Sequence, residues 1–79
     1  DLVVKQRSKW HYAAILEFKI VDKFNQMLKA CDEALQQIED KDYEATLRDE
    51  QYENIAKLGI CFCQKRCRVK SGGIDRVEY

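Results

Sequence analysis

The sequence predicts an α/β domain built on a small mixed sheet in ββαββ order. Two early stretches, 2–6 and 10–20, are apolar and rich in strand-forming residues, and the polar letters KQRSK between them indicate a hairpin. Apolar residues then recur every three or four positions over 24–38, which indicates a helix that packs on the sheet. Two further strand-like stretches, 55–63 and 67–70, complete the pattern.

The connections between these elements follow from their order. We expect Asp22 to cap the N-terminus of the helix over 24–38. A shorter, acidic helical stretch around 43–52 is expected on the surface. Because strand, helix and strand follow one another, the second and third strands should be parallel. The last residues, 74–79, alternate like a strand but fit a tail equally well.

The 79 residues allow a single domain, residues 1–79, with a formal net charge of zero. Zero net charge argues against a general attraction to nucleic acid, but the charges are unevenly spread. From Asp32 to Glu53, nine acids face only Lys41 and Arg48. Basic residues gather near both ends of the chain, at Lys5, Arg7 and Lys9 and at Lys65, Arg66, Arg68 and Lys70. Contact with phosphates and ordinary solvated surface explain these clusters about equally well.

No stretch approaches the roughly 20 apolar residues that span a bilayer, and no signal peptide is present, so we expect a soluble, cytoplasmic protein. The cysteines lack the dense spacing of a secreted disulfide scaffold. Cys61, Cys63 and Cys67 could hold zinc with Cys31 or His11, but their C-x-C-x(3)-C spacing differs from the usual knuckles. We therefore expect Cys61 and Cys63, which share one strand face, to behave as small apolar residues, and His11 to have no site role.

The stretch ILEFKI, 15–20, places two charges in the most apolar segment of the chain. Side chains alternate along a strand, so Glu17 and Lys19 share one face about 7 Å apart, while Phe18 takes the other. If Gln6 to Lys9 form the turn of the hairpin, the residue numbers of paired positions add up to 15 or 16. Asp1 then comes within diagonal reach of Glu17, about 7–8 Å. Two carboxylates and an ammonium then meet at the outgoing strand end, where α/β sheets bind ligands.

Two carboxylates held together repel each other, and a divalent cation between them removes the repulsion. Oxygen ligands are those that magnesium prefers. A lysine beside a metal-bound water can stabilise hydroxide and neutralise charge on a phosphate, so the trio suits phosphodiester hydrolysis. The simpler alternative is a solvated charge pair at a strand end.

Asp1, fifteen intervening residues and then Glu17-Phe18-Lys19 resemble the bipartite D-x(n)-ExK signature of the PD-(D/E)XK nuclease superfamily. The stretches EALQQIEDKDY, 33–43, and IAKLGICFCQKRCRVK, 55–70, resemble the nuclease domain that follows an AAA-ATPase-like domain in a family of bacterial proteins. The resemblance covers nearly the whole chain. It implies a restriction-endonuclease-like core, here a partial one without the first helix of the superfamily, and an ATPase-like domain as a partner in a longer chain.

The resemblance also implies roles for individual residues. Asp1 and Glu17 would be ligands of Mg²⁺ or Mn²⁺, and Lys19 would be the catalytic lysine. Gln37, at the edge of the apolar helix stripe, matches the helical glutamine that related nucleases keep near the site, and Tyr43 would accompany it.

We therefore predict a metal-dependent nuclease core that hydrolyses the phosphodiester bonds of DNA. The basic residues of the last hairpin, Lys65, Arg66, Arg68 and Lys70, are expected either to contact the DNA backbone or to protect an edge strand from aggregation. The alternative function is a non-catalytic DNA-binding or protein-interaction module with the same fold. One face of the long strand lacks a cover in this chain, so either a helix preceding Asp1 or a second copy, in a homo-oligomer, is expected to bury it.

Overall fold

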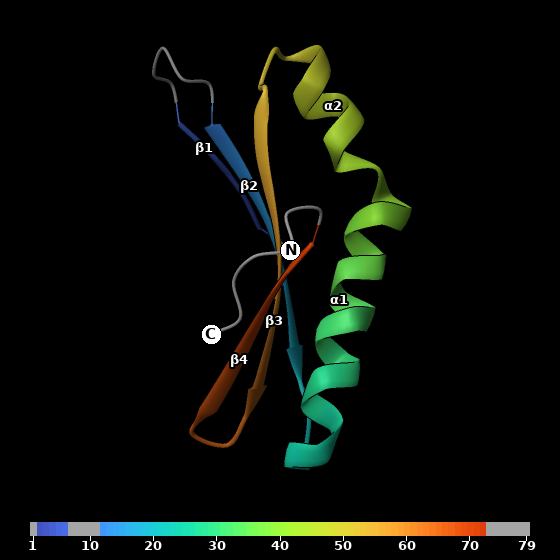
Figure 1. Ribbon diagram of the computed structural model, residues 1–79, viewed down its shortest axis with the longest axis vertical. Coiled ribbons are helices and arrows are strands. Elements are labelled where there is room, and N and C mark those ends of the chain that lie inside the picture. The colour runs from blue at the N-terminus through green and yellow to red at the C-terminus, as the bar shows by residue number, and fades with distance from the viewer. Residues whose placement is uncertain (1, 7–11, 73–79) are drawn as a thin grey trace.

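The computed structural model describes residues 2–6 and 12–72 (Figure 1). Four strands form one sheet: β1 (Leu2–Lys5), β2 (Tyr12–Ile20), β3 (Asn54–Cys63) and β4 (Arg66–Gly72). Three helical segments connect β2 to β3: the 3-10 helix η1 (Phe24–Gln26), α1 (Met27–Lys41) and α2 (Tyr43–Asp49). The spatial order is β1-β2-β3-β4, with β2 and β3 parallel and both outer pairs antiparallel. The predicted α/β class and ββαββ order are confirmed.

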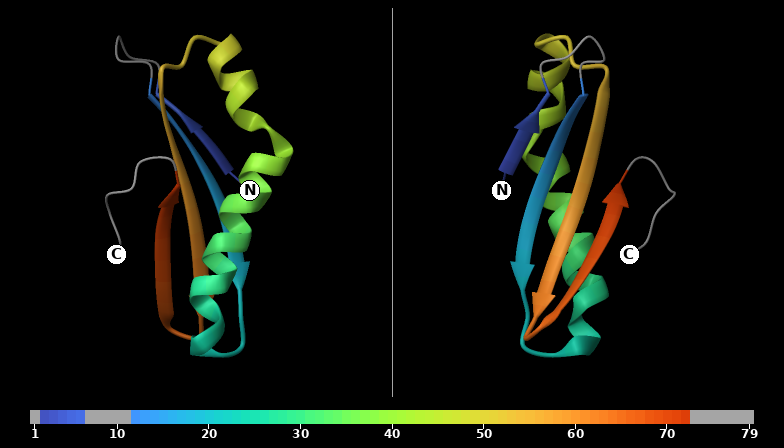
Figure 2. Two further views of the ribbon diagram at one scale, coloured as in Figure 1. Left: turned by 45° about the vertical axis from the view of Figure 1, so that its right-hand side comes forward. Right: turned by 90° about the vertical axis from the view of Figure 1, so that its left-hand side faces the viewer.

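Helix α1 lies along one face of the sheet (Figure 2). The core beneath it contains two clusters, one of Ala13, Ile15, Ile38, Leu47 and Tyr52, and one of Met27, Ala30, Cys31, Cys61 and Cys63. The helix passes so close to β3 that a Cβ atom added to Gly59 would lie 2.6 Å from the carbonyl oxygen of Cys31. Any side chain at position 59 would push the helix away from the sheet, so a glycine is needed there.

Cys61 and Cys63 lie in the core, as predicted for small apolar residues on one strand face. Cys31, Cys61 and Cys63 are free and buried under α1, and Cys67 is free and exposed. Burial raises the pKa of the Cys31 and Cys61 thiols, which keeps them protonated at neutral pH. Within the described ranges, no three His, Cys, Asp or Glu side chains are grouped so that they could hold a metal ion, and His11 lies outside those ranges.

The opposite face of the sheet carries apolar side chains that no described helix covers. Phe18 of β2 and Phe62 of β3 stack there with ring centroids 6.2 Å apart, and both are exposed. Ile20, in the same alternation, is 84% exposed. Tyr12, Leu2 and Val4 extend this apolar surface toward β1. The expectation of an uncovered face therefore holds for the described part of the chain, while the identity of its cover stays a prediction.

The register of the first hairpin differs from the predicted one. Leu2 pairs with Leu16 and Lys5 with Ala13, so paired positions sum to 18 rather than to 15 or 16. This register places Val3 opposite Ile15, and both belong to the core beneath α1. The burial of this pair excludes a register shifted by one residue, because such a slip would move Val3 away from the core face. The predicted strand start at Trp10 and the possible strand over 74–79 lie outside the described residues.

The helical region also departs from the prediction at two points. Asp22 is not the N-cap of the helix, because the 3-10 helix η1 precedes α1, which begins only at Met27. The residue that caps η1 is Lys23, whose backbone N–H donates to Gln26 Oε1 at 3.3 Å. The second helix ends at Asp49 rather than near Tyr52, and it is not merely a surface element. Its Leu47 is buried, as is Tyr52 beyond its end, so α2 closes one end of the core.

In the part of the chain that the structure describes, no helix is both long enough and apolar enough to cross a membrane.

Candidate active site

Glu17 lies on the face of β2 that α1 covers. Ala13, Ile15 and Glu17 alternate along this face, and all three are buried. Among the described residues, 2–6 and 12–72, Glu17 is the one polar or charged residue that is buried. A carboxylate is costly to bury unless a positive group or a metal ion compensates it. The observed position of Glu17, on a core strand and beneath a helix, is therefore chemically unusual enough to mark a candidate site.

Lys41 supplies a positive charge beside this carboxylate. Its Nζ lies 3.8 Å from Glu17 Oε2, and the side chain of Lys41 is 41% exposed whereas that of Glu17 is 10% exposed. Lys41 is the last residue of α1, because the next residue, Asp42, adopts a left-handed conformation with φ 54° and ψ 39° that ends the helix. The lysine thus reaches Glu17 from the helix terminus and keeps contact with solvent.

Sequence reasoning missed Lys41, although a signal for it exists. Ala34 and Ile38 are buried on the sheet side of α1, and Lys41 continues this stripe by three residues beyond Ile38. Extending the predicted helix from residue 38 to residue 41 would have placed Lys41 over the sheet.

Gln37 lies one turn before Lys41 and on the same side of the helix. Its side chain is partly buried, and its Oε1 atom is fully buried with no hydrogen-bond donor among residues 2–6 and 12–72. The predicted placement of Gln37 at the edge of the buried stripe agrees with this position. A buried amide oxygen without a donor is an unusual feature, and it can accept a proton donor or bind a cation.

Lys19 lies two residues beyond Glu17 on the same face of β2, as predicted. It is half-buried and lines a surface hollow of about 350 Å³ between the end of β2 and the first turns of α1. The other residues that line this hollow are Ile20, Val21, Asp22, Gln26, Lys29, Ala30 and Glu33. Glu17 therefore lies beneath the helix, while the lysine of the ExK motif reaches an opening to solvent.

Asp1, the other predicted carboxylate ligand, lies outside the described residues, as do residues 7–11. The described chain begins at Leu2, whose partner in β2 is Leu16, the neighbour of Glu17. The start of β1 is thus beside the strand segment that carries Glu17. Tyr43 opens α2 and packs against the core cluster that contains Ile38, next to the end of α1.

The predicted DNA-binding residues form a separate group. Arg66, Arg68 and Lys70 alternate along β4 and pair with Cys63, Cys61 and Gly59, so they project from the α1 side of the sheet. The Arg66 guanidinium stacks 4.6 Å above the centre of the Phe24 ring, and Lys70 forms an ion pair with Asp32. Lys65 is exposed in the turn that precedes β4. Because β3 separates β4 from β2, the structure does not bring these residues into contact with Glu17.

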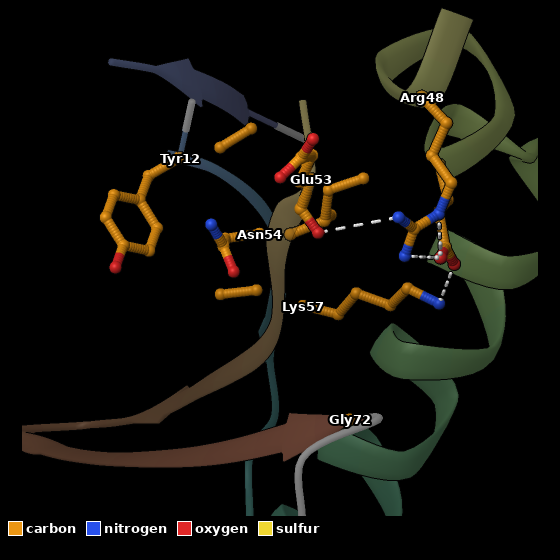
Figure 3. A pocket seen from close by; sticks show the side chains of 10 residues that line it. Tyr12, Arg48, Glu53, Asn54, Lys57 and Gly72 are labelled. Carbon is orange, nitrogen blue, oxygen red and sulfur yellow. Dashed lines mark hydrogen bonds and ion pairs between the residues drawn. The ribbon is translucent and has the colours of Figure 1, made fainter. Parts of the chain in front are cut away.

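A second group of charges lies under the other part of the helical layer (Figure 3). Lys57 of β3 is only 13% exposed and bonds to Glu39 of α1 at 2.6 Å and to Glu44 of α2. Arg48 also donates to Glu44, at 2.9 and 3.1 Å. Hydrogen bonds from Lys57 and then Arg48 lower the pKa of Glu44. Burial opposes the charge of Lys57, but the bonds to Glu39 and Glu44 prevail and raise its pKa. We define these four residues as the Lys57 network.

The Lys57 network borders another hollow of about 350 Å³, which Tyr12, Glu53 and Asn54 also line. In this view Lys57 extends from β3 toward the helices, Arg48 extends from α2 toward Lys57, and Tyr12 points to the other side (Figure 3). The network joins α1, α2 and β3 by close hydrogen bonds, and its role is therefore to hold the helical layer on the sheet.

The fold and the site together define a class of protein. A mixed four-stranded sheet, with a glutamate and a lysine spaced as ExK on a central strand beneath a helix, is compatible with a restriction-endonuclease-like fold. A comparison with family models identifies the PD-(D/E)XK nuclease superfamily over residues 1–72, so the chain belongs to this superfamily. Nucleases of the superfamily typically use divalent metal ions. Searches of curated proteins and of solved structures found no match.

Proposed function

We propose that this chain is the core of a metal-dependent nuclease that hydrolyses the phosphodiester bonds of DNA. The observation that carries the proposal is the burial of Glu17 beneath α1, with Lys19 two residues later on the same strand face. An ordinary solvated pair at a strand end would leave both charges in water. Glu17 instead lies beneath the helix, where a carboxylate needs positive charge close to it.

The oxygen atoms of Glu17 and Gln37 are of the chemical types that bind magnesium or manganese. Glu17 offers a carboxylate and Gln37 a buried amide oxygen without a donor in the described ranges, and both are ligand types of hard divalent cations. Asp1 would add the second carboxylate, since Leu2, the residue after it, pairs with the residue before Glu17. A bound cation would polarise a phosphate oxygen and lower the pKa of a bound water.

Lys19 has a distinct task in this proposal. Its flexible four-carbon stem starts on the face of Glu17 and its ammonium can reach the hollow at the strand end. From there it can orient a water molecule and neutralise negative charge on a phosphate. The role depends on a compact, movable positive charge, which Lys19→Met would remove while the apolar stem is retained.

Contacts to DNA are proposed for Lys65, Arg66, Arg68 and Lys70. They lie on or next to β4, which is two strand spacings, or about 10 Å, from β2. Phosphates along one DNA strand advance by about 3.4 Å each, so about three phosphates separate such contacts from a bond held at Glu17. The separation of the basic residues from Glu17 is therefore compatible with one continuous DNA backbone.

The alternative proposal is a non-catalytic interaction module, and the exposed Phe18–Phe62 pair favours it. An exposed apolar surface of this kind commonly marks a contact with another protein. Two covers are proposed for it: a second copy of the chain, or the AAA-ATPase-like domain of a longer chain.

Nicking of supercoiled plasmid DNA in the presence of Mn²⁺ tests the proposed function. We expect the wild-type chain to nick the plasmid, and Glu17→Gln and Lys19→Met to lose about 10²-fold or more of the rate. Asp49→Asn and Lys23→Met are matched controls, because both residues are exposed, and we expect them to retain activity.

Equal nicking by the wild type, Glu17→Gln and Lys19→Met would contradict the assignment of these residues to the reaction. A folded wild-type chain that fails to nick DNA would instead support the non-catalytic module.

A further inference from the structure

Phe24 lies in the connection between β2 and α1, and it is exposed although it is a large aromatic residue. It belongs to η1, 47% of it is exposed, and the Arg66 guanidinium of β4 lies 4.6 Å from the centre of its ring. This contact joins the start of the helical layer to the turn between β3 and β4 (Figure 2). The guanidinium covers only one face of the ring, so part of the ring stays open to a ligand.

Two further cations close to this pair are exposed. Lys65 is in the turn between β3 and β4, and Arg68 is two residues beyond Arg66, on the same face of β4. Lys70 follows in the same alternation, but its ion pair with Asp32 of α1 neutralises it. The positive charge is therefore concentrated at the end of β4 that lies next to the aromatic ring.

An exposed leucine adds to the apolar part of this surface. Leu28 precedes Asp32 by one helical turn, and the ion pair of Asp32 with Lys70 shows that this side of α1 faces β4. Leu28 is 55% exposed. We define the Phe24 surface as the apolar residues Phe24 and Leu28 with the cations Lys65, Arg66 and Arg68.

We propose that the Phe24 surface binds single-stranded DNA, with an unpaired base stacked on Phe24 and neighbouring phosphates held by Lys65 and Arg68. Proteins bind single strands in this way, with exposed aromatic rings among cations, because every base has a flat face that stacks. A base within a duplex has its faces covered by its neighbours, so the ring would gain no stacking contact there. This inference rests on the proposed function, because it names the form of DNA that the same protein binds.

The charges around the Phe24 surface also favour one strand over two. Asp22 and Glu33 are exposed at the hollow of Lys19, and Asp32 is exposed beside Lys70. These carboxylates lie next to the cations and repel a second phosphate backbone. A narrow band of positive charge with acids beside it can follow one backbone, whereas a duplex presents two.

The Phe24 surface lies beside the proposed reaction site. Val21, Asp22 and Gln26 line the hollow that Lys19 reaches, and Phe24 belongs to the same connection between β2 and α1. A DNA strand that lies along β4 and over Phe24 would therefore lead its next nucleotides toward Lys19. The inferred surface thus serves the reaction site rather than a distant part of the molecule.

Fluorescence anisotropy with labelled oligonucleotides in EDTA tests the inference without cleavage of the DNA. We expect the 79-residue chain to bind a single strand of mixed sequence more tightly than a duplex of the same length. An abasic strand keeps the phosphates but lacks the bases. We expect the chain to bind it about fivefold more weakly than the base-bearing single strand, because the stacking contact is lost.

Phe24→Leu separates stacking from charge. It keeps an apolar side chain but removes the ring, so we expect affinity for the single strand to fall about fivefold and affinity for the abasic strand to stay unchanged. Phe24→Tyr keeps the ring and should bind like the wild type. Phe62→Leu is the matched control, because Phe62 is an exposed aromatic residue on the opposite face of the sheet, and we expect no change. Circular dichroism establishes that each variant is folded.

Arg68→Gln should act differently, because it removes a phosphate contact and leaves the ring. We expect it to weaken binding of the base-bearing and abasic strands equally, and to reduce the slope of log affinity against log salt concentration by about 0.7. Lys5→Gln is its control, because Lys5 is an exposed cation on the distant strand β1, and the slope should stay unchanged.

The outcomes distinguish the inference from the proposed function. If the wild type binds the duplex or the abasic strand as tightly as the single strand, stacking on Phe24 is wrong. The same holds if Phe24→Leu weakens binding of the base-bearing and abasic strands alike, or of neither. In these cases the proposed nuclease is still judged by the nicking of plasmid DNA. If the wild type binds no DNA in any form, the proposed contacts to DNA are wrong and the inference falls with them.

Discussion

Two groups of charges lie between the helical layer and the sheet, and they are paired in different ways. In the Lys57 network, a nearly buried lysine bonds to two carboxylates, one of which also accepts two hydrogen bonds from Arg48. At the other group, a buried Glu17 has Lys41 at 3.8 Å, and Gln37, one helical turn before Lys41, has an Oε1 atom that lacks a donor within the described chain. The first arrangement satisfies its members and joins the helices to the sheet. The second includes a buried amide oxygen, that of Gln37, without a hydrogen-bond donor.

The largest effect on stability that we expect from this comparison comes from Lys57→Met. The substitution keeps most of the apolar stem but removes the charge that holds Glu39 and Glu44, so α1, α2 and β3 lose a shared contact. We expect the free energy of unfolding to fall by about 1–2 kcal/mol, less than for a fully buried pair because both glutamates can be hydrated. Urea denaturation at pH 7 measures this change, and an unaltered midpoint would show that the network does not stabilise the fold.

Glu17→Gln should act in the opposite sense on stability. The amide has nearly the shape of the carboxylate and removes a buried charge whose Lys41 contact is longer than a hydrogen bond. We expect the free energy of unfolding to stay the same or to rise by up to about 1 kcal/mol, as is common when a residue that serves activity is replaced. The same urea denaturation tests this, and a loss as large as that of Lys57→Met would place Glu17 among the structural residues.

A smaller effect is expected from pH. Hydrogen bonds from Lys57 and Arg48 lower the pKa of Glu44 from its ordinary value of 4.5. Its stabilising contribution is therefore complete above the unfolded-state value and is lost as pH falls through the lowered value in the folded protein. Because the side chain is partly exposed, we expect Glu44→Gln to reduce stability at pH 7 by less than about 1 kcal/mol.

The difference between Glu44→Gln and the wild type should shrink as the pH falls below the ordinary pKa of 4.5 and through the lowered pKa of Glu44 in the folded protein. Urea denaturation at pH 7 and at pH 3 measures it. A difference that stays constant between the two pH values would mean that the charge of Glu44 does not contribute.

Much of this fold could be predicted from the sequence because its signals are local. The alternation in ILEFKI placed Glu17 and Lys19 on one face and Phe18 on the other, as the structure shows. The long apolar run predicted that β3 starts at residue 55, and the strand starts one residue earlier, at Asn54. The periodicity of α1 put Gln37 at the edge of the buried stripe.

The missed features depend on helix ends and on long-range packing. No glycine or proline marks the end of α1. Asp42 instead adopts the left-handed conformation that ends the helix. The contact of Lys41 with Glu17 follows from that end point together with the way α1 crosses the sheet. The spacing from Ile38 to Lys41 indicates the side of the helix on which Lys41 lies, but not how far the helix extends. The hairpin register was also missed. The burial of Val3 and Ile15 fixes which face each residue takes, but paired residue numbers that add up to 16 would give the same faces as the observed 18.

The nine residues of β2 contribute side chains to both faces of the sheet. Glu17 and Lys19 face the helix, and Phe18, between them, faces the uncovered side, where it stacks on Phe62. A protein or domain that packs on Phe18 would therefore press on the same short piece of backbone that sets the spacing of the glutamate and the lysine. Assembly on the Phe18 side of the sheet would restrain the positions of Glu17 and Lys19 on the other side without contacting them.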